Sequence, residues 1–126
     1  MESTIPVGKD DVNLAGHVDN VVLYRWFNEQ RLELFDTVSQ RRGKAFVPPY
    51  VKTELQFKRE VFDHEAVKIE LELTHTGNRS FQLYQVLRQD GDICATCETV
   101  AVNFCTETQE VIALDESLKA LLAELL

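Results

Sequence analysis

The sequence predicts a single α+β domain in which one long helix is followed by an antiparallel sheet. The chain of 126 residues is long enough for one core, and no repeat or Gly/Ser/Pro-rich linker divides it. Residues 20–39 contain neither proline nor glycine and carry apolar side chains at helical spacing. After residue 50 the apolar period changes to two. Strands grouped after a helix favour an antiparallel sheet, so we expect one domain over residues 1–126.

The first part of the chain is expected to form a short strand, a polar loop and the long helix. Thr4–Lys9 is the candidate strand, and Asp10–Asp19 is polar and contains glycine, which is typical of a loop. The helix is predicted over Asn20–Ser39. Its apolar side chains are Leu23, Tyr24, Trp26, Phe27, Leu32, Leu34, Phe35 and Val38. So broad an apolar surface indicates a helix that is buried over much of its circumference.

Four strands and a closing helix account for the rest of the chain. Alternation predicts strands at Val51–Lys58, Val67–Thr74, Ser80–Arg88 and Ile93–Phe104. Turn signals separate the last three strands, at residues 76–79 and 90–92. Asp115 is a candidate N-cap for a final helix with leucines on one face. One helix covers only one face of such a sheet, so the sheet curls or uses an edge for assembly, and both favour oligomerisation.

Composition and charge exclude several classes of protein. The chain has 13 basic and 21 acidic side chains and a formal charge of −8, which disfavours nucleic acid and anionic membranes as partners. No apolar run reaches the length of a membrane span, and the first residues lack the features of a secretory signal. The odd number of cysteines, three, suits a reducing compartment. We therefore expect a cytoplasmic domain.

The spacing Cys94-Ala-Thr-Cys97 resembles half of a metal or redox motif. It falls in a predicted strand, where side chains three positions apart point to opposite faces. No second Cys pair or nearby His pair completes a zinc site. We expect small buried strand residues and no metal site.

Candidate chemistry is concentrated in the loop before the long helix. The free N–H groups and positive dipole end of a helix N-terminus can stabilise an oxyanion. Gly16 lets the backbone approach a ligand closely, and His17 is a candidate for proton transfer, because histidine is the usual side chain for that role near neutral pH. Asp19 and Glu29 are candidate bases.

Each of these residues also has an ordinary structural interpretation. Asp19 or Asn20 is a common type of N-cap residue, and His17 in a loop is more often a hydrogen-bonding residue than a catalyst. Glu29 and Arg31 are typical of a solvated helix face, although so apolar a helix favours burial. From the residues alone, both interpretations stay open.

The segment from Asp11 to Asn20, DVNLAGHVDN, with Tyr24 and Glu29-Gln30-Arg31 after it, resembles the signature of hotdog-fold acyl-CoA thioesterases. The most similar group is the 4-hydroxybenzoyl-CoA thioesterase type, with a pattern near D-x-D-x-x-G-H-V-N-N. The resemblance covers essentially the whole chain, because a hotdog fold is a long helix wrapped by a curled antiparallel sheet of about five strands.

The resemblance implies a thioester held at the start of the helix, with the N–H of Asn20 polarising its carbonyl. Many members place a catalytic carboxylate where this chain has Asn13, and an amide cannot act as a base or form an anhydride. Asn13 is then a water or substrate positioner, with Asp19 and Glu29 as competing bases. His17 would position groups or transfer a proton. The Asn-Leu-x-Gly form also resembles hotdog thioesterases of enediyne polyketide pathways, which act on carrier-protein thioesters.

Substrate contacts are also implied by the resemblance. The turn with Arg79 and Ser80 resembles the family's turn beside coenzyme A, and a guanidinium grips phosphate well. Arg59 is a further candidate for the phosphates. It lies on the same side of the strand as Phe57, which would point it towards an interface, whereas the more common outcome for such a residue is a solvated charge at a strand end. Tyr24 is a candidate wall of the acyl tunnel, and Gly16 a point of close backbone approach.

Three kinds of function are compatible with the sequence. The resemblance implies an acyl-CoA thioesterase that works as a homodimer or homotetramer, with coenzyme A as part of the substrate and no cofactor. A thioesterase for carrier-protein substrates is the second, mildly disfavoured by the negative charge. Asn13 favours the third, a non-catalytic module that binds acyl thioesters.

Overall fold

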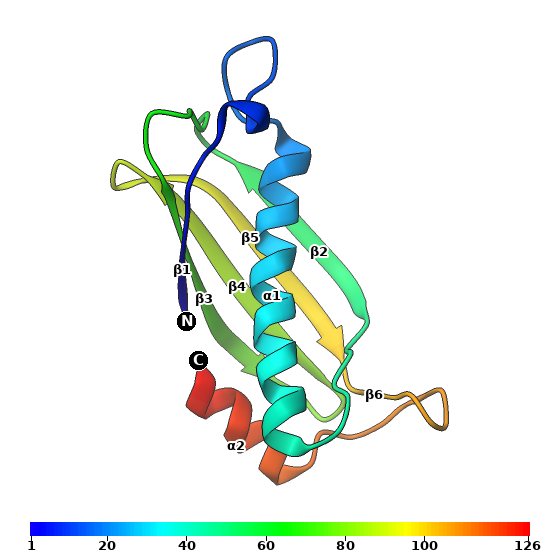
Figure 1. Cartoon of the computed structure of the whole chain (residues 1–126). Coiled ribbons are helices and arrows are strands. Elements are labelled where there is room, and N and C mark those ends of the chain that lie inside the picture. The colour runs from blue at the N-terminus through cyan, green and yellow to red at the C-terminus, as the bar shows by residue number, and fades with distance from the viewer.

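The computed structural model describes all 126 residues and has two helices and a five-stranded sheet (Figure 1). The elements are β1 (Glu2–Ile5), a 3-10 turn (Lys9–Asp11), α1 (Asn20–Arg42), β2 (Tyr50–Phe57), β3 (Val67–Thr76), β4 (Ser80–Gln89), β5 (Asp92–Val102), β6 (Phe104–Cys105), β7 (Glu110–Val111) and α2 (Glu116–Leu125). The predicted α+β class is confirmed. Neither helix combines the length and apolar character needed to cross a bilayer.

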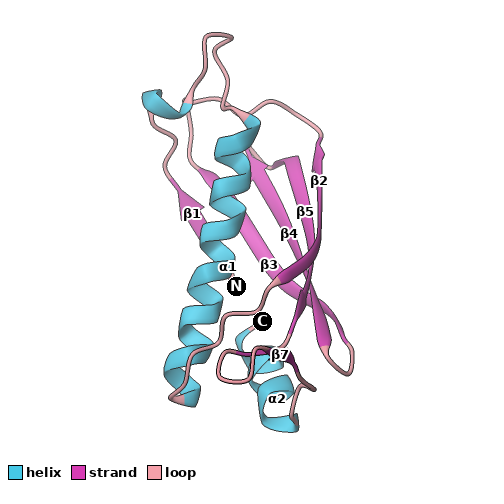
Figure 2. Ribbon diagram, turned by 90° about the vertical axis from the view of Figure 1, so that its right-hand side faces the viewer, coloured by secondary structure: helices cyan, strands magenta, loops and turns pink.

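The sheet is antiparallel throughout, in the order β1-β3-β4-β5-β2, and it curves around α1 (Figure 2). The helix crosses one face of the sheet, and α2 closes the end where α1 finishes. The arrangement expected from the resemblance, a helix wrapped by a curled sheet, is therefore confirmed. Strand β2 is a free edge of eight residues, whereas the other edge strand, β1, has only four.

The core lies between α1 and the sheet in two halves. One half surrounds Trp26 and Phe27 near the start of α1 and includes Val61 from the β2–β3 loop. The other half surrounds Phe35, near the end of α1, and includes leucines of α2. Phe35 packs edge-on against Phe46 and Phe81. These contacts bury one side of α1. The predicted burial over much of the circumference holds only in part, because Leu32 on the opposite side is 51% exposed.

The ends of both helices follow from capping residues. The Asp19 side chain accepts the N–H of Val21 at 2.9 Å, and the Asp115 side chain accepts the N–H of Leu118 at 2.8 Å. Asp115 was predicted as a cap, and this is confirmed. Helix α1 runs three residues past the predicted end, because nothing breaks it before Gly43, whose φ of 70° forms a left-handed C-cap.

The structure differs from the predicted elements at positions that depend on how the strands pair, which the composition of a segment does not reveal. Strand β1 lies at Glu2–Ile5 rather than Thr4–Lys9, and the small β6–β7 hairpin was not predicted. A register shift beside Val51 turns this side chain outward, so that it is 62% exposed.

A second register shift corrects the expectation for the cysteines. Leu87 pairs with Ala95 while Arg88 pairs with Ile93, so Cys94 is an extra, unpaired residue of β5. Cys94 and Cys97 consequently lie in the same core cluster and not on opposite faces. Their predicted burial is confirmed, with 2% and 0% exposure.

Candidate active site

The loop that precedes α1 is a tight hairpin that projects from the end of the molecule (Figure 1). The N–H of Asn13 donates to the carbonyl of His17 at 2.9 Å, and the N–H of Gly16 donates to the carbonyl of Asn13 at 3.0 Å. Gly16 has a φ of 88°, a conformation that favours glycine. The Asn13 side chain accepts the N–H of Ala15 at 2.9 Å. Its amide oxygen is therefore used within the loop, while its NH₂ group points to no protein acceptor.

The start of α1 presents a free donor to solvent. The N–H groups of Val22 and Leu23 donate to the carbonyl of Asp19, and that of Val21 to its side chain. The N–H of Asn20 has no partner among the hydrogen bonds of the structure, and the residue is exposed. An unpaired N–H at a helix N-terminus is suited to an anion or an oxyanion. The ordinary interpretation of Asp19 as an N-cap is confirmed.

His17 is supported by the β2–β3 loop. Its Nδ1 lies 2.9 Å from a carboxylate oxygen of Glu60, although the approach is off the axis of a good hydrogen bond. The Glu60 side chain is more than half exposed. The next residue, Val18, donates its N–H to the carbonyl of Val61 at 2.7 Å, and Phe62 meets the His17 ring edge-on. Sequence reasoning missed Glu60, because no local signal links it to the first loop.

Arg31 is fully buried and forms no ion pair, which settles its open assignment in favour of burial. Its guanidinium donates to Oε1 of Gln85 at 2.7 Å and to Sγ of Cys97 at 3.3 Å. It lies 4.7 Å from the ring centre of Tyr50 and 5.6 Å from that of Tyr24. The positive charge of Arg31 is therefore stabilised by neutral dipoles and by the faces of two aromatic rings. The Arg31 guanidinium therefore lies near an aromatic ring of α1, that of Tyr24, and one of β2, that of Tyr50.

Glu29 lies apart from the loop. It belongs to the exposed side of α1, where its carboxylate is 3.7 Å from Arg25, and it follows Asn20 by about 13 Å along the helix. The structure does not bring Glu29 together with Asn13, His17 or Asp19 within one protomer.

The expected coenzyme A residues occupy opposite ends of the molecule. Arg59 lies just after β2 near the start of α1; its side chain is 66% exposed and pairs with Asp92 at 3.4 Å. Of the two interpretations of Arg59, the solvated charge at a strand end is the one that the structure shows, and the interface-facing one is wrong, because β2 ends at Phe57 and the alternation of the strand no longer applies to residue 59. Arg79 is exposed and Ser80 is half-buried in the β3–β4 turn, beside the approach to α2 (Figure 1).

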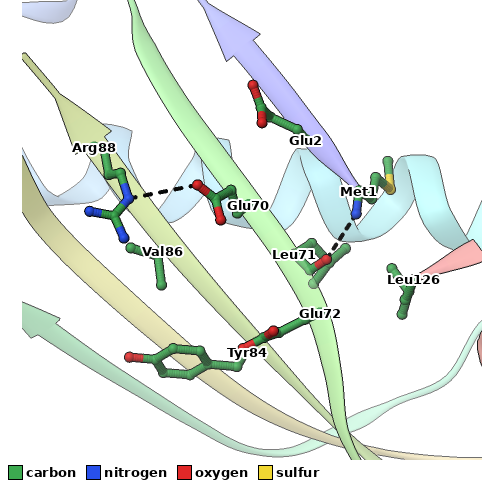
Figure 3. Close-up of a pocket in the computed structure, with 9 residues that line it drawn as sticks. All are labelled: Met1, Glu2, Glu70, Leu71, Glu72, Tyr84, Val86, Arg88 and Leu126. Atoms are coloured by element: carbon green, nitrogen blue, oxygen red, sulfur yellow. Dashed lines mark hydrogen bonds and ion pairs between the residues drawn. The ribbon is translucent and has the colours of Figure 1, made fainter. Parts of the chain in front are cut away.

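The principal cavities of the protomer do not include the loop before α1 or the N–H of Asn20. One cavity of about 410 Å³ lies on the sheet face turned away from α1 (Figure 3). Glu70 and Arg88 form an ion pair there at 3.7 Å, and Glu2 and Glu72 add negative charge. It contains no nucleophile and is remote from the helix start. A closed site at Asn20 would require a second surface.

Two apolar features are available for such a surface. Phe57, at the end of the free edge β2, is 45% exposed, and Leu14, at the tip of the loop, is fully exposed. An unpaired edge strand is a template for pairing with another strand.

Several proteins of known structure share this architecture, although no curated protein matches the sequence. A predicted thioesterase from Bacillus stearothermophilus is 21% identical, with a TM-score of 0.88 over 98% of this chain and 93% of that chain. A thioesterase from Thermus thermophilus, complexed with coenzyme A and Zn, is 18% identical, with a TM-score of 0.83 over 98% and 92%. The BH1999 gentisyl-coenzyme A thioesterase is 20% identical, with a TM-score of 0.81 over 98% and 100%.

These likenesses establish the fold, and the hotdog architecture expected from the sequence is confirmed. The sequence also matches a protein family. The family model of the thioesterase-like superfamily covers residues 7–122, which is nearly the whole chain. The chain belongs to the thioesterase-like superfamily.

Proposed function

We propose that this protein hydrolyses acyl-CoA thioesters. The observation that carries the proposal is the exposed, unpaired N–H of Asn20 at the start of α1, three residues after His17, whose imidazole is paired with Glu60. Superfamily membership supports thioester chemistry, and two structural relatives are described as a coenzyme A complex and a gentisyl-coenzyme A thioesterase. No cofactor is required, since coenzyme A is part of the substrate.

In this mechanism the thioester carbonyl accepts the N–H of Asn20. A water molecule loses a proton to a base and its oxygen attacks the carbonyl carbon. The negative charge that develops on the carbonyl oxygen is stabilised by that N–H and by the helix dipole. The tetrahedral intermediate then collapses, the C–S bond breaks, and the coenzyme A thiolate leaves and takes up a proton. The NH₂ group of Asn13 would orient the water or the substrate.

Three groups compete for the role of base. His17 can accept a proton on Nε2 when its Nδ1 proton faces Glu60. Asp19 uses one oxygen as the N-cap, which leaves the other for water. Glu29 would act from a second copy of the chain, because nine residues of α1 separate it from Asn20 in its own protomer. Geometry favours His17 or Asp19.

The site is completed, in this proposal, by a homodimer that pairs the free β2 edges antiparallel, and two dimers can associate into a tetramer. Antiparallel pairing about a two-fold axis sets the β3–β4 end of one copy beside the α1 start of the other. Arg79 and Ser80 of the second copy would then approach the coenzyme A phosphates, together with Arg59 of the first. The three free cysteines are consistent with action in the cytoplasm.

The test measures thiol release from a panel of acyl-CoA and acyl-carrier-protein thioesters. We expect turnover by the wild type on coenzyme A esters, and its loss in His17→Ala or Asp19→Ala identifies the base. Glu29→Ala is compared with Glu33→Ala, a matched change on the same exposed side of α1. Absence of turnover on every ester would contradict the proposal.

A binding module without catalysis is the second candidate. It is favoured by Asn13, which lacks a carboxylate and uses its amide oxygen within the loop. This alternative predicts saturable binding of an acyl-CoA with no thiol release, so calorimetric titration with the same esters separates the two functions.

A further inference from the structure

A cluster of metal-ligating side chains lies between the β2–β3 loop and the β4–β5 hairpin. His64 and Glu65 come from the loop, and Asp90 comes from the hairpin. Nε2 of His64 is 2.7 Å from a carboxylate oxygen of Asp90, and one ligand atom from each residue lies within 4.8 Å of the others. We propose that His64, Glu65 and Asp90 bind a divalent ion of the zinc class.

The donor set selects this class of ion. One imidazole nitrogen with two carboxylates suits Zn²⁺ and its first-row neighbours, whereas Ca²⁺ and Mg²⁺ prefer oxygen ligands alone. Bonds of about 2.0–2.2 Å bring ligand atoms to roughly 3 Å from one another. The His64–Asp90 pair already meets this spacing. All three side chains are exposed, so Glu65 can move the remaining distance at little cost.

Electrostatics also favours a cation at this point. The adjoining cavity of about 410 Å³ is lined by Asp90, Glu60 and Asp92, with Arg59 as the only basic side chain besides His64. A divalent ion would neutralise part of this excess of carboxylates.

The backbone around the cluster is held independently of any ion. The Gln89 side chain donates to the carbonyl groups of Phe62 and Glu65, both at 2.7 Å, and accepts the N–H of Phe62 at 2.9 Å. Asp90 adopts a φ of 54°, which places it at the tip of the hairpin. The two segments are thus fixed side by side, so binding carries little entropic cost for their association.

An ion bound at this position would be linked to the loop before α1 through the β2–β3 loop. The β2–β3 loop carries Glu60 against His17 and Val61 against Val18, and the ion would fasten that loop to the β4–β5 hairpin. Metal binding itself does not depend on the proposed thioesterase activity, and its test uses no turnover.

The experiment uses the full chain, produced without a histidine tag and stripped with a chelator. ZnCl₂ is titrated by calorimetry, and the melting temperature is measured with and without Zn²⁺. We expect one ion per chain and a raised melting temperature. His64→Ala, Glu65→Gln and Asp90→Asn should each weaken binding at least about tenfold, since even changes outside the ligand shell cost that much. Asparagine tolerates the left-handed backbone at position 90.

His75→Ala is the matched control, because His75 is an exposed histidine in β3 outside the cluster. Binding that is absent in the wild type, or equally weakened in His75→Ala, overturns the proposal. Melting curves in chelator confirm that each variant folds. Co²⁺ provides a second readout: visible bands without a thiolate charge-transfer band support the His/carboxylate set, whereas a thiolate band would assign the ion to Cys94 and contradict it.

Discussion

His17 and Glu60 lie 2.9 Å apart, Nδ1 to carboxylate oxygen, and they join the loop before α1 to the loop between β2 and β3. The backbone bond from Val18 to Val61 and the edge contact of His17 with Phe62 reinforce the same junction. The candidate site is therefore built by two loops, and the second one holds the first in place.

The first prediction concerns this pair. His17→Ala should lower kcat for acyl-CoA hydrolysis about 100-fold if His17 is the base. Glu60→Gln should lower kcat by roughly tenfold with little change in KM, because it disturbs only the orientation of the imidazole. Steady-state thiol release measures both. Unchanged kcat in His17→Ala, with full loss in Asp19→Ala, would transfer the role to Asp19.

The second prediction concerns Asn13. Asn13→Asp keeps an oxygen that accepts the N–H of Ala15, so the loop should be preserved. The new carboxylate can act as a base, and we expect activity to be retained or raised. Thiol release and circular dichroism check the result. A collapse of activity in a folded variant would show that position 13 does not face the thioester.

The third prediction concerns the buried Arg31. Gln85→Leu removes the nearest acceptor and leaves the guanidinium only the weaker contacts with Sγ of Cys97 and Oδ1 of Asn28, so it should lower the free energy of unfolding by about 3 kcal/mol. The double variant Arg31→Met/Gln85→Leu should recover part of this loss, because the buried charge is gone. Urea unfolding measures both variants. A double variant less stable than Gln85→Leu alone would show that packing, not charge, dominates.

The fourth prediction is a pH dependence at the start of α2. Hydrogen bonds from Ser117 and the N–H of Leu118, with Arg42 nearby, lower the pKa of Asp115. Because the pKa is lower in the folded state, the stabilisation is complete above the ordinary value of about 3.9 and is lost as pH falls through the folded value. Asp115→Ala should cost about 1 kcal/mol at pH 7, and the difference should shrink below about pH 4. Chemical unfolding of the wild type and of Asp115→Ala across pH checks this, and a difference that does not change with pH would contradict it.

The fifth prediction concerns assembly. Phe57→Lys introduces a charge at the exposed end of β2 and should dissociate the proposed dimer. Sedimentation velocity measures the result. Val111→Lys, an equally exposed apolar position on β7, is the control and should leave the dimer intact. A monomeric wild type would contradict the β2 pairing.

Much of the fold could be predicted because its signals are local. The apolar pattern of α1, the caps Asp19 and Asp115, and the alternation of β3 and β4 are all written in short stretches of sequence. The exceptions are bulges: Val51 and Cys94 each change the face of a strand, and no local pattern marks the residue at which pairing slips.

The candidate site could be predicted only in part, for a different reason. The loop residues and the N–H of Asn20 follow from one segment of chain. Glu60 reaches His17 only because the β2–β3 loop folds over the helix start, and Asp90 meets His64 only through the hairpin beside that loop. Contacts of this kind depend on tertiary packing, which the periodicity of apolar residues along the sequence does not describe.

Two neighbouring residues on α1 reach different strands of the sheet. Gln30 donates to Ser3 and to the carbonyl of Ile69, while Arg31 donates to Gln85 on a central strand. These hydrogen bonds fix both the rotation of α1 about its own axis and its position along the sheet. Changes that admit bulkier or smaller ligands are therefore expected in the loops and at the free edge strand β2, and directed evolution should leave Gln30 and Arg31 unchanged.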